Sequence, residues 1–98
     1  MIVDGIAYLR FGRPIRIGWW ICELRRHGIS DVVSFRFPRE SEFVFVVDQA
    51  ANGEWALYAD DDTGECLGPV SLSDDGLSFE YAGALAKASA LREAMHAS

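Results

Sequence analysis

Residues 31–59 read DVVSFRFPRESEFVFVVDQAANGEWALYA and hold three β-strand patterns separated by two turns. Residues 31–37 alternate apolar and polar side chains, which is the period of a half-buried strand. Residues 43–47 form a continuous apolar run rich in β-branched side chains, which predicts a strand in the middle of a sheet. Residues 54–59 follow an Asn-Gly turn signal and form the third strand. Because both connections are short, the three strands are expected to be antiparallel neighbours.

The strand pattern continues on both sides of this stretch. Residues 65–72 indicate a fourth strand, in which Gly68-Pro69 predicts a bulge or a sheet edge. Residues 2–10 are apolar and predict an additional N-terminal strand with a weak point at Gly5. Residues 73–78 contain Ser, Asp and Gly and are expected to form a loop. The chain is therefore predicted to contain an antiparallel meander of three to five strands.

Two further segments are predicted to be helices. Residues 15–27 follow Pro14, which is favoured at helix starts, and precede Gly28, which suits a helix C-terminus. Residues 81–96 are rich in alanine and carry an apolar stripe at helical spacing. The stripe consists of Tyr81, Ala84, Leu85, Ala88, Leu91 and Met95, so Lys87, Arg92 and Glu93 are expected to face water. The predicted fold class is α+β: one domain over residues 1–98, an antiparallel meander of three to five strands with two helices packed on one face.

Composition places the chain among small globular proteins. Half of its 98 residues are hydrophobic and 12% are aromatic, which is enough apolar mass for one core. No apolar run is long enough to span a bilayer, and the acidic residue Asp4 does not fit the basic start of a signal peptide. We therefore expect a cytoplasmic protein with no membrane partner. Cys22 and Cys66 are expected to be free thiols, because disulfides are unusual in a reducing compartment.

Charge is distributed unevenly along the sequence. The net charge is −6, but residues 1–42 carry seven arginines against five acidic residues. Residues 43–98 carry ten acidic residues against only Lys87 and Arg92. Acidic surfaces repel nucleic acid and speed encounters with basic proteins. The alternative interpretation is that acidic turns only keep a small domain soluble.

Two sets of residues are candidates for contacts with a partner. The first is acidic and comprises Asp60, Asp61, Asp62, Glu65, Asp74 and Asp75. The second is aromatic and basic and comprises Trp19, Trp20, Arg25 and Arg26, because Trp and Arg are enriched at interface hot spots. Adjacent residues on a helix point about 100° apart, so one tryptophan could be in the core and the other in a contact surface. The alternative is that both are covered within the domain.

No pattern indicates catalysis, a metal ion or a cofactor. Counting Asp60 as the first position of a calcium loop places Ser71 at the twelfth, where a glutamate is required. Neither His27 nor His96 lies in a recognisable base motif, and no Cys/His cluster exists. The sequence therefore predicts a protein that is not an enzyme.

Residues 43–95 resemble the small β-β-β-α domain of HicB-type antitoxins. The resemblance lies in the strand pair FVFVVD (43–48) and GEWALY (53–58), followed by an alanine-rich helix. Gly64-Glu65-Cys66 approximates the Gly-Cys step of that family, but the helix starts later here and no DNA-binding tail follows. The resemblance carries no functional expectation.

The leading hypothesis is an inhibitor that occupies the basic surface of a protein partner. Anti-CRISPR proteins and toxin-immunity proteins of phages or other mobile elements are the analogous classes. A second hypothesis is a regulatory or structural subunit that forms a homodimer through a sheet edge or the tryptophans. A third is a nucleic-acid-binding domain that uses the arginine-rich first half, which the acidic balance disfavours.

Overall fold

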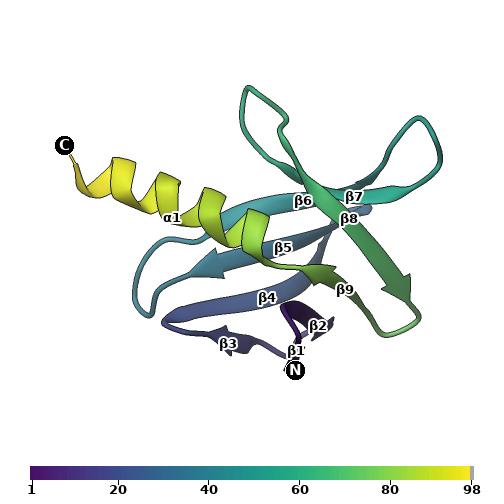
Figure 1. The fold of residues 1–98 in the computed structure, drawn as a ribbon, viewed down its shortest axis with the longest axis horizontal. Helices are drawn as coiled ribbons and strands as arrows, with labels where there is room; N and C mark the ends of the chain where they lie inside the picture. The colour runs from purple at the N-terminus through teal and green to yellow at the C-terminus, as the bar shows by residue number, and fades with distance from the viewer. Residues whose placement is uncertain (98) are drawn as a thin grey trace.

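The computed structural model describes residues 1–97 and shows a sheet of nine antiparallel strands followed by one helix (Figure 1). The strands are β1 (Ile2–Val3), β2 (Ile6–Arg10), β3 (Ile15–Ile17), β4 (Trp20–His27), β5 (Ser30–Arg36), β6 (Phe43–Gln49), β7 (Trp55–Ala59), β8 (Cys66–Ser73) and β9 (Gly76–Glu80). The helix is α1 (Ala82–His96). The spatial order is β1-β2-β9-β8-β7-β6-β5-β4-β3, so strands β3 to β9 form one continuous meander. The predicted fold, with three to five strands and two helices, is therefore wrong.

The sheet curls until β2, next to one end of the strand order, contacts β4, next to the other end, which makes the sheet close to a barrel. Strand β2 pairs with β9, the last strand of the meander. Directly after β2, Phe11 forms a bridge with Leu24 of β4, and the Gly12 amide donates to the Leu24 carbonyl at 3.3 Å. Curling in this way buries one face of the sheet and reduces the exposed edge. The short strands β1 and β3 remain at the two ends of the strand order.

The segment predicted as a helix at residues 15–27 is a β-hairpin made of β3 and β4. Ile17 pairs with Trp20, and the two-residue turn between them begins with Gly18 at φ +60°. A positive φ at the first turn position and a negative one at the second is the pattern of a type II′ turn, which suits the twist of a hairpin. A two-residue turn shifts the alternation by one position. As a result Ile17, Trp20 and Leu24 have helical spacing although they lie on strands.

Two other predictions, for residues 2–10 and 73–78, are also wrong. Residues 2–10 form the β1–β2 hairpin, because Asp4 and Gly5 both have positive φ and make a turn between Val3 and Ile6. An Asp-Gly pair is a strong hairpin signal, so Gly5 belongs to a turn and is not a weak point within one strand. Residues 73–78 are not all loop, since β9 begins at Gly76.

The central predictions are confirmed. Strands β5, β6, β7 and β8 lie within one or two residues of their expected limits. The predicted irregularity at Gly68-Pro69 is a bulge: the step from Ala56 to Tyr58 in β7 is matched by the longer step from Cys66 to Pro69 in β8. Strand β8 pairs on both sides and is not an edge strand.

The core lies inside the curled sheet and under the helix. Alternate residues of each strand point inward, and their fully buried members include Leu24, Val33, Phe35, Phe45 and Leu57. Helix α1 starts after β9 and packs on β6 and β8 (Figure 1). It contributes Ala84 and Ala88, both completely buried, so that the helix axis can lie close to the sheet.

The predicted helix stripe is correct except at its end. Tyr81, Leu85 and Leu91 pack against the core, but Met95 is exposed. Lys87 and Arg92, expected to face water, are partly covered and join the helix to two loops. Among residues 1–97, no helix is long and apolar enough to cross a membrane.

Candidate functional site

Trp19 occupies the tip of the β3–β4 hairpin and is 70% exposed, whereas its neighbour Trp20 is 7% exposed and belongs to the core. Successive residues of a strand point to opposite sides, so the turn separates the two rings. Of the two alternatives that the sequence left open, the structure has the one with one tryptophan in the core and the other on the surface. This arrangement arises from a hairpin and not from a helix.

Trp20 fixes the position of the hairpin tip through an aromatic cluster. Its ring makes edge contacts with Phe37 at 4.7 Å and with Phe35 and Phe43 at 6.3 Å between ring centres. Aromatic pairs in this geometry contribute roughly 0.5–1.5 kcal/mol each beyond their buried area. Trp20, which directly follows Trp19, is therefore held in place by ring packing. Its shortest ring contact is with Phe37, the residue that precedes the β5–β6 loop.

The β5–β6 loop beside the hairpin contains an unusual backbone conformation at Arg39. The Glu40 amide donates to the Phe37 carbonyl at 3.1 Å, and Arg39 has φ +66°. With Pro38 at the first central position, this is the pattern of a type II turn, whose second central position favours glycine. An arginine in the left-handed region is strained, and such strain often marks a functional position.

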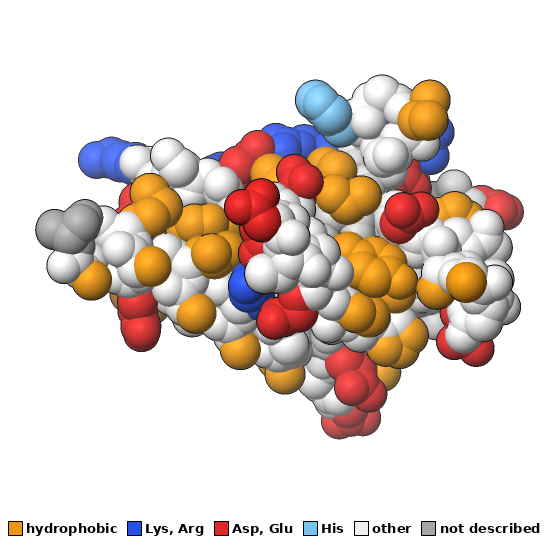
Figure 2. All heavy atoms as spheres, turned by 90° about the horizontal axis from the view of Figure 1, so that it is seen from above, with side chains coloured by type: hydrophobic (Ala, Val, Ile, Leu, Met, Phe, Trp, Pro, Cys, Tyr) orange, Lys and Arg blue, Asp and Glu red, His pale blue; other side chains and the backbone are white. Residues whose placement is uncertain are grey.

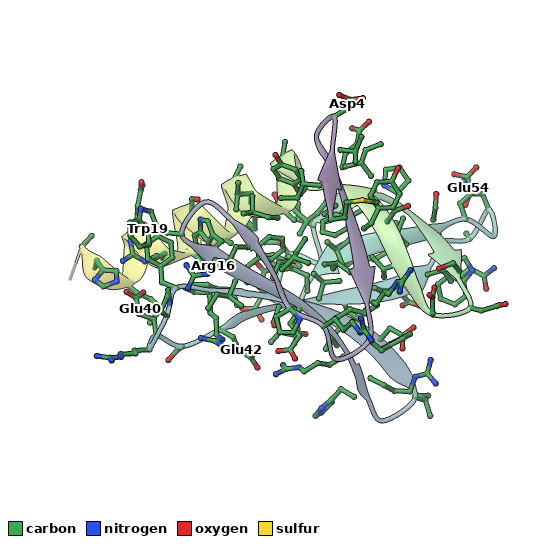
Figure 3. All side chains as sticks on the ribbon, turned by 90° about the horizontal axis from the view of Figure 1, so that it is seen from below. Asp4, Arg16, Trp19, Glu40, Glu42 and Glu54 are labelled. Atoms are coloured by element: carbon green, nitrogen blue, oxygen red, sulfur yellow. The ribbon has the colours of Figure 1, made fainter. Side chains whose placement is uncertain are left out.

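The tip of the hairpin and this loop lie on the same side of the molecule (Figure 3). Figure 3 shows Trp19 and Arg16 on the same side of the molecule as Glu40 and Glu42, away from Asp4 and Glu54. We call Arg16, Trp19 and Arg39 the Trp19 surface. All three side chains are exposed. Within residues 1–97, neither Arg16 nor Arg39 makes an ion pair.

The carboxylates near the Trp19 surface are already occupied. Arg92 donates two hydrogen bonds to Glu40, at 2.9 and 3.0 Å, and these lower the pKa of the Glu40 carboxyl. Arg25 donates to Glu42 at 2.6 Å, which raises the pKa of Arg25. Three arginines on this side make no ion pair within residues 1–97: Arg16, Arg39 and Arg36, which shares a cross-strand row with Arg16. In a chain of net charge −6, this is a local positive surface beside an exposed aromatic ring.

Arg25 and Arg26 do not join Trp19, because they lie toward the other end of β4. Arg25 reaches across the outer face of β5 to Glu42. Arg26 binds Asp31 at 3.0 Å, and its guanidinium lies 5.2 Å from the centre of the Phe11 ring. Both guanidinium groups thus have partners within the protein.

The predicted acidic set is divided between the two ends of β8. Asp60, Asp61, Asp62 and Glu65 lie in or beside the β7–β8 turn, which precedes the strand, and Asp74 and Asp75 form the β8–β9 turn that follows it. A strand of eight residues is roughly 23 Å long. Asp75 also pairs with Arg10 at 3.4 Å. In the view of Figure 2, acidic side chains form several separate groups and not one continuous patch.

Asp61 organises the β7–β8 turn. Its Oδ1 accepts hydrogen bonds from the Thr63 hydroxyl and from the amides of Thr63 and Gly64, and its Oδ2 lies 3.2 Å from the Lys87 ammonium. The Thr63 hydroxyl is the largest cause that lowers the pKa of Asp61 to about 2, followed by Lys87. Asp60, Asp62 and Glu65 have no ion pair among the described residues.

The two cysteine thiols have different environments. Burial raises the pKa of the Cys22 thiol to about 12, which keeps it protonated and unreactive. Cys66 is exposed, and both cysteines are free. Within residues 1–97, no group of three or more His, Cys, Asp or Glu side chains is arranged to hold a metal ion.

Sequence reasoning did not place Ile29 on the surface, and it did not group Arg16 or Arg39 with Trp19. Ile29 follows Gly28 in a second two-residue hairpin turn and is fully exposed. The pairs Gly18-Trp19 and Gly28-Ile29 share a Gly-X signal that could have located both hairpins. No sequence signal identifies the left-handed backbone of Arg39.

Comparisons with protein-family models, with curated proteins and with solved structures found no match to this chain. The structure also has four strands before the helix within residues 43–95, where the antitoxin-like pattern has three.

Proposed function

We propose that this chain is a non-enzymatic protein-binding module and that the Trp19 surface is its main contact. The observation that carries the proposal is the 70% exposure of Trp19 on a hairpin anchored by Trp20. A tryptophan buries 150–250 Å² when covered, so covering the exposed part contributes roughly 3–4 kcal/mol before the costs of association. Arg16 and Arg39 supply charge-assisted hydrogen bonds at the rim.

The test is capture of a partner from the native host with wild type and two matched variants, Trp19→Ser and Ile29→Ser. Both positions are second in a Gly-X hairpin turn and both side chains are exposed, but they lie at opposite ends of β4. We expect a partner that is retained by wild type and by I29S but lost with W19S. Equal retention by W19S and wild type would contradict the proposal.

Arg39→Gly provides an independent variant that does not depend on Trp19. Glycine suits the left-handed backbone of residue 39, so R39G keeps or improves the fold while it removes the side chain. Loss of the partner with R39G, at unchanged or increased thermal stability, supports a direct contact. Retention of the partner by R39G limits the contact to Trp19 and Arg16.

An inhibitor that covers the basic surface of a partner is the second candidate function. It would use fewer acidic residues than the sequence suggested. It rests on Asp60, Asp62 and Glu65, the acidic residues of the β7–β8 turn that have no ion pair within residues 1–97. In this case capture would be lost at high salt and with Asp60→Asn/Asp62→Asn, but not with W19S. The analogy with anti-CRISPR and toxin-immunity proteins applies to this candidate.

Self-association is the outcome that sedimentation would detect. Recovery of the chain alone, together with a dimer that W19S dissociates, would favour the homodimer.

Nucleic-acid binding is disfavoured by the internal pairing of Arg25 and Arg26. Measured binding to nucleic acid that weakens steeply with salt would support the nucleic-acid hypothesis again. A cytoplasmic location is part of the proposal, because Cys22 and Cys66 are free thiols.

A further inference from the structure

A groove with a volume of about 620 Å³ lies on the outer face of β2, β9 and β8. Its polar lining includes Tyr8, Arg10, Arg13, Ser71, Ser78 and Asp75. The volume is within the 300–1,000 Å³ typical of small-molecule sites. No residue of the Trp19 surface lines the groove, so the groove is a site distinct from that surface.

The strand register explains why this face is hollowed. Tyr8, Ser78 and Ser71 stand opposite one another in a single row across β2, β9 and β8. In the next row Arg10 faces Gly76, and Gly76 faces Ser73. Small side chains therefore cover β8 and β9, whereas the large side chains of Tyr8 and Arg10 rise on β2. The alternate residues Leu9 and Leu77 point into the core and fix the orientation of the row.

The groove contains hydrogen-bond donors that the protein does not use. Within residues 1–97, the hydroxyls of Tyr8, Ser71 and Ser78 and the guanidinium of Arg13 have no hydrogen-bond or ion-pair partner. The guanidinium of Arg10 lies 3.4 Å from Asp75, in an ion pair whose side chains are both 65% exposed. Pairs of this kind are weak and readily rearranged.

We propose that this groove binds a small molecule that carries an oxyanion, a phosphate or a carboxylate. The groove lining contains two guanidinium groups, of Arg10 and Arg13, and one carboxylate, of Asp75, so the groove is locally positive in an acidic protein. The three hydroxyls in one row can donate to adjacent oxygens of the same group, and the guanidinium of Arg13 can bind two of them at once. Pro14 and Ile15 supply an apolar wall for the rest of the ligand.

The experiment is a titration of the ¹⁵N-labelled full chain followed by NMR, at constant ionic strength. Phenyl phosphate and benzoate are the probes that distinguish phosphate from carboxylate, and benzyl alcohol is the neutral control. We expect saturable shifts at Ser71, Ser78 and Tyr8 with at least one anion and none with benzyl alcohol. Arg13→Ala should weaken binding at least roughly tenfold, since the charge-assisted hydrogen bonds of the guanidinium are lost.

Arg39→Ala is the matched control, because it removes the same charge from an exposed site outside the groove. It should leave the affinity unchanged. Absence of saturable shifts with both anions would overturn the inference. Equal weakening by R13A and R39A would overturn it as well, because that result indicates general attraction to charge and no defined site.

Discussion

Arg92 lies with its guanidinium 3.8 Å from the centre of the Phe37 ring, and the same group binds both carboxylate oxygens of Glu40. Arg92 is on α1, and Glu40 is 52 residues earlier in the β5–β6 loop. Planar stacking combined with two parallel hydrogen bonds is an arrangement that lysine cannot reproduce. This contact holds the C-terminal half of the helix against the loop that carries Arg39.

Arg92→Ala should lower the thermal unfolding midpoint, because it removes both the ring contact and the ion pair with Glu40. Arg92→Lys should restore only part of the loss, since an ammonium group cannot make both hydrogen bonds while stacked. Calorimetry of the two variants checks this. Glu93→Ala, an exposed change on the same helix, is the control and should have little effect.

Ala88→Leu should destabilise the fold by about 1–3 kcal/mol, because Ala88 is completely buried between the helix and the sheet. Ala90→Leu makes the same change two residues further along, where the side chain is exposed, and should stay within about 0.5 kcal/mol of wild type. Urea unfolding of both variants measures the difference. Similar stabilities would show that the helix does not pack closely on the sheet.

Gly76→Ala should be much more damaging than its size suggests. A Cβ at residue 76 would lie 1.8 Å from the carbonyl oxygen of Leu9, so β2 could not pair with β9 as it does. We expect a loss of more than about 3 kcal/mol or failure to fold. Ser78→Ala, two residues along the same strand, should be close to neutral in urea unfolding. A stable G76A protein would contradict the close approach of the two strands.

The two cysteines should differ sharply in reactivity. Cys66 is exposed and should react with a thiol reagent in the folded protein at pH 8. Cys22 is buried, and with a pKa raised to about 12 it should react only after denaturant is added. Counting the modified thiols by mass spectrometry should give one in the native state and two in the unfolded state. Reaction of Cys22 at the same rate as Cys66 would argue against the buried position of β4.

Asp61 should contribute to stability in a pH-dependent way. Its pKa in the folded protein is about 2, below the ordinary value of 3.8, so the ionised carboxylate stabilises the fold above pH 3.8. The contribution is lost as the pH falls from about 3.8 to about 2. Asp61→Asn should therefore be less stable than wild type at neutral pH and approach it near pH 2, as measured by urea unfolding. Asp60→Asn keeps the contacts of Asp61 and should retain the wild-type pH profile.

The parts of the fold that sequence predicted are those in which local pattern and tertiary environment agree. The runs at 31–37 and 43–47 and the alanine-rich helix each have a single interpretation, since their periods and propensities point the same way. The prediction for 15–27 failed because a two-residue turn gave the apolar residues of a hairpin helical spacing. The prediction for 2–10 failed for a different reason: the Asp4-Gly5 hairpin signal is present in the sequence and outweighs the apolar run around it.

The candidate site was predictable only in its chemistry. The sequence allowed Trp19 and Trp20 to be divided between core and surface, but only the strand geometry decided that Trp19 is the exposed one. Adjacency in sequence grouped Arg25 and Arg26 with Trp19, although an extended strand of eight residues carries them toward the other end of β4. The same effect separated residues 60–62 from Asp74 and Asp75.

By itself the sequence determined a small acidic chain with a β-rich centre and an alanine-rich terminal helix, because these properties depend on composition and local period. Only the tertiary structure decided that nine strands curl into one nearly closed sheet and that the hydroxyls of Tyr8, Ser78 and Ser71 share a row. It also decided that Arg92 reaches Glu40. These features depend on the pairing of residues far apart in the chain, such as Phe11 with Leu24 and Arg10 with Gly76. Strand register is set by the burial of one whole face, and no local stretch of sequence contains that information.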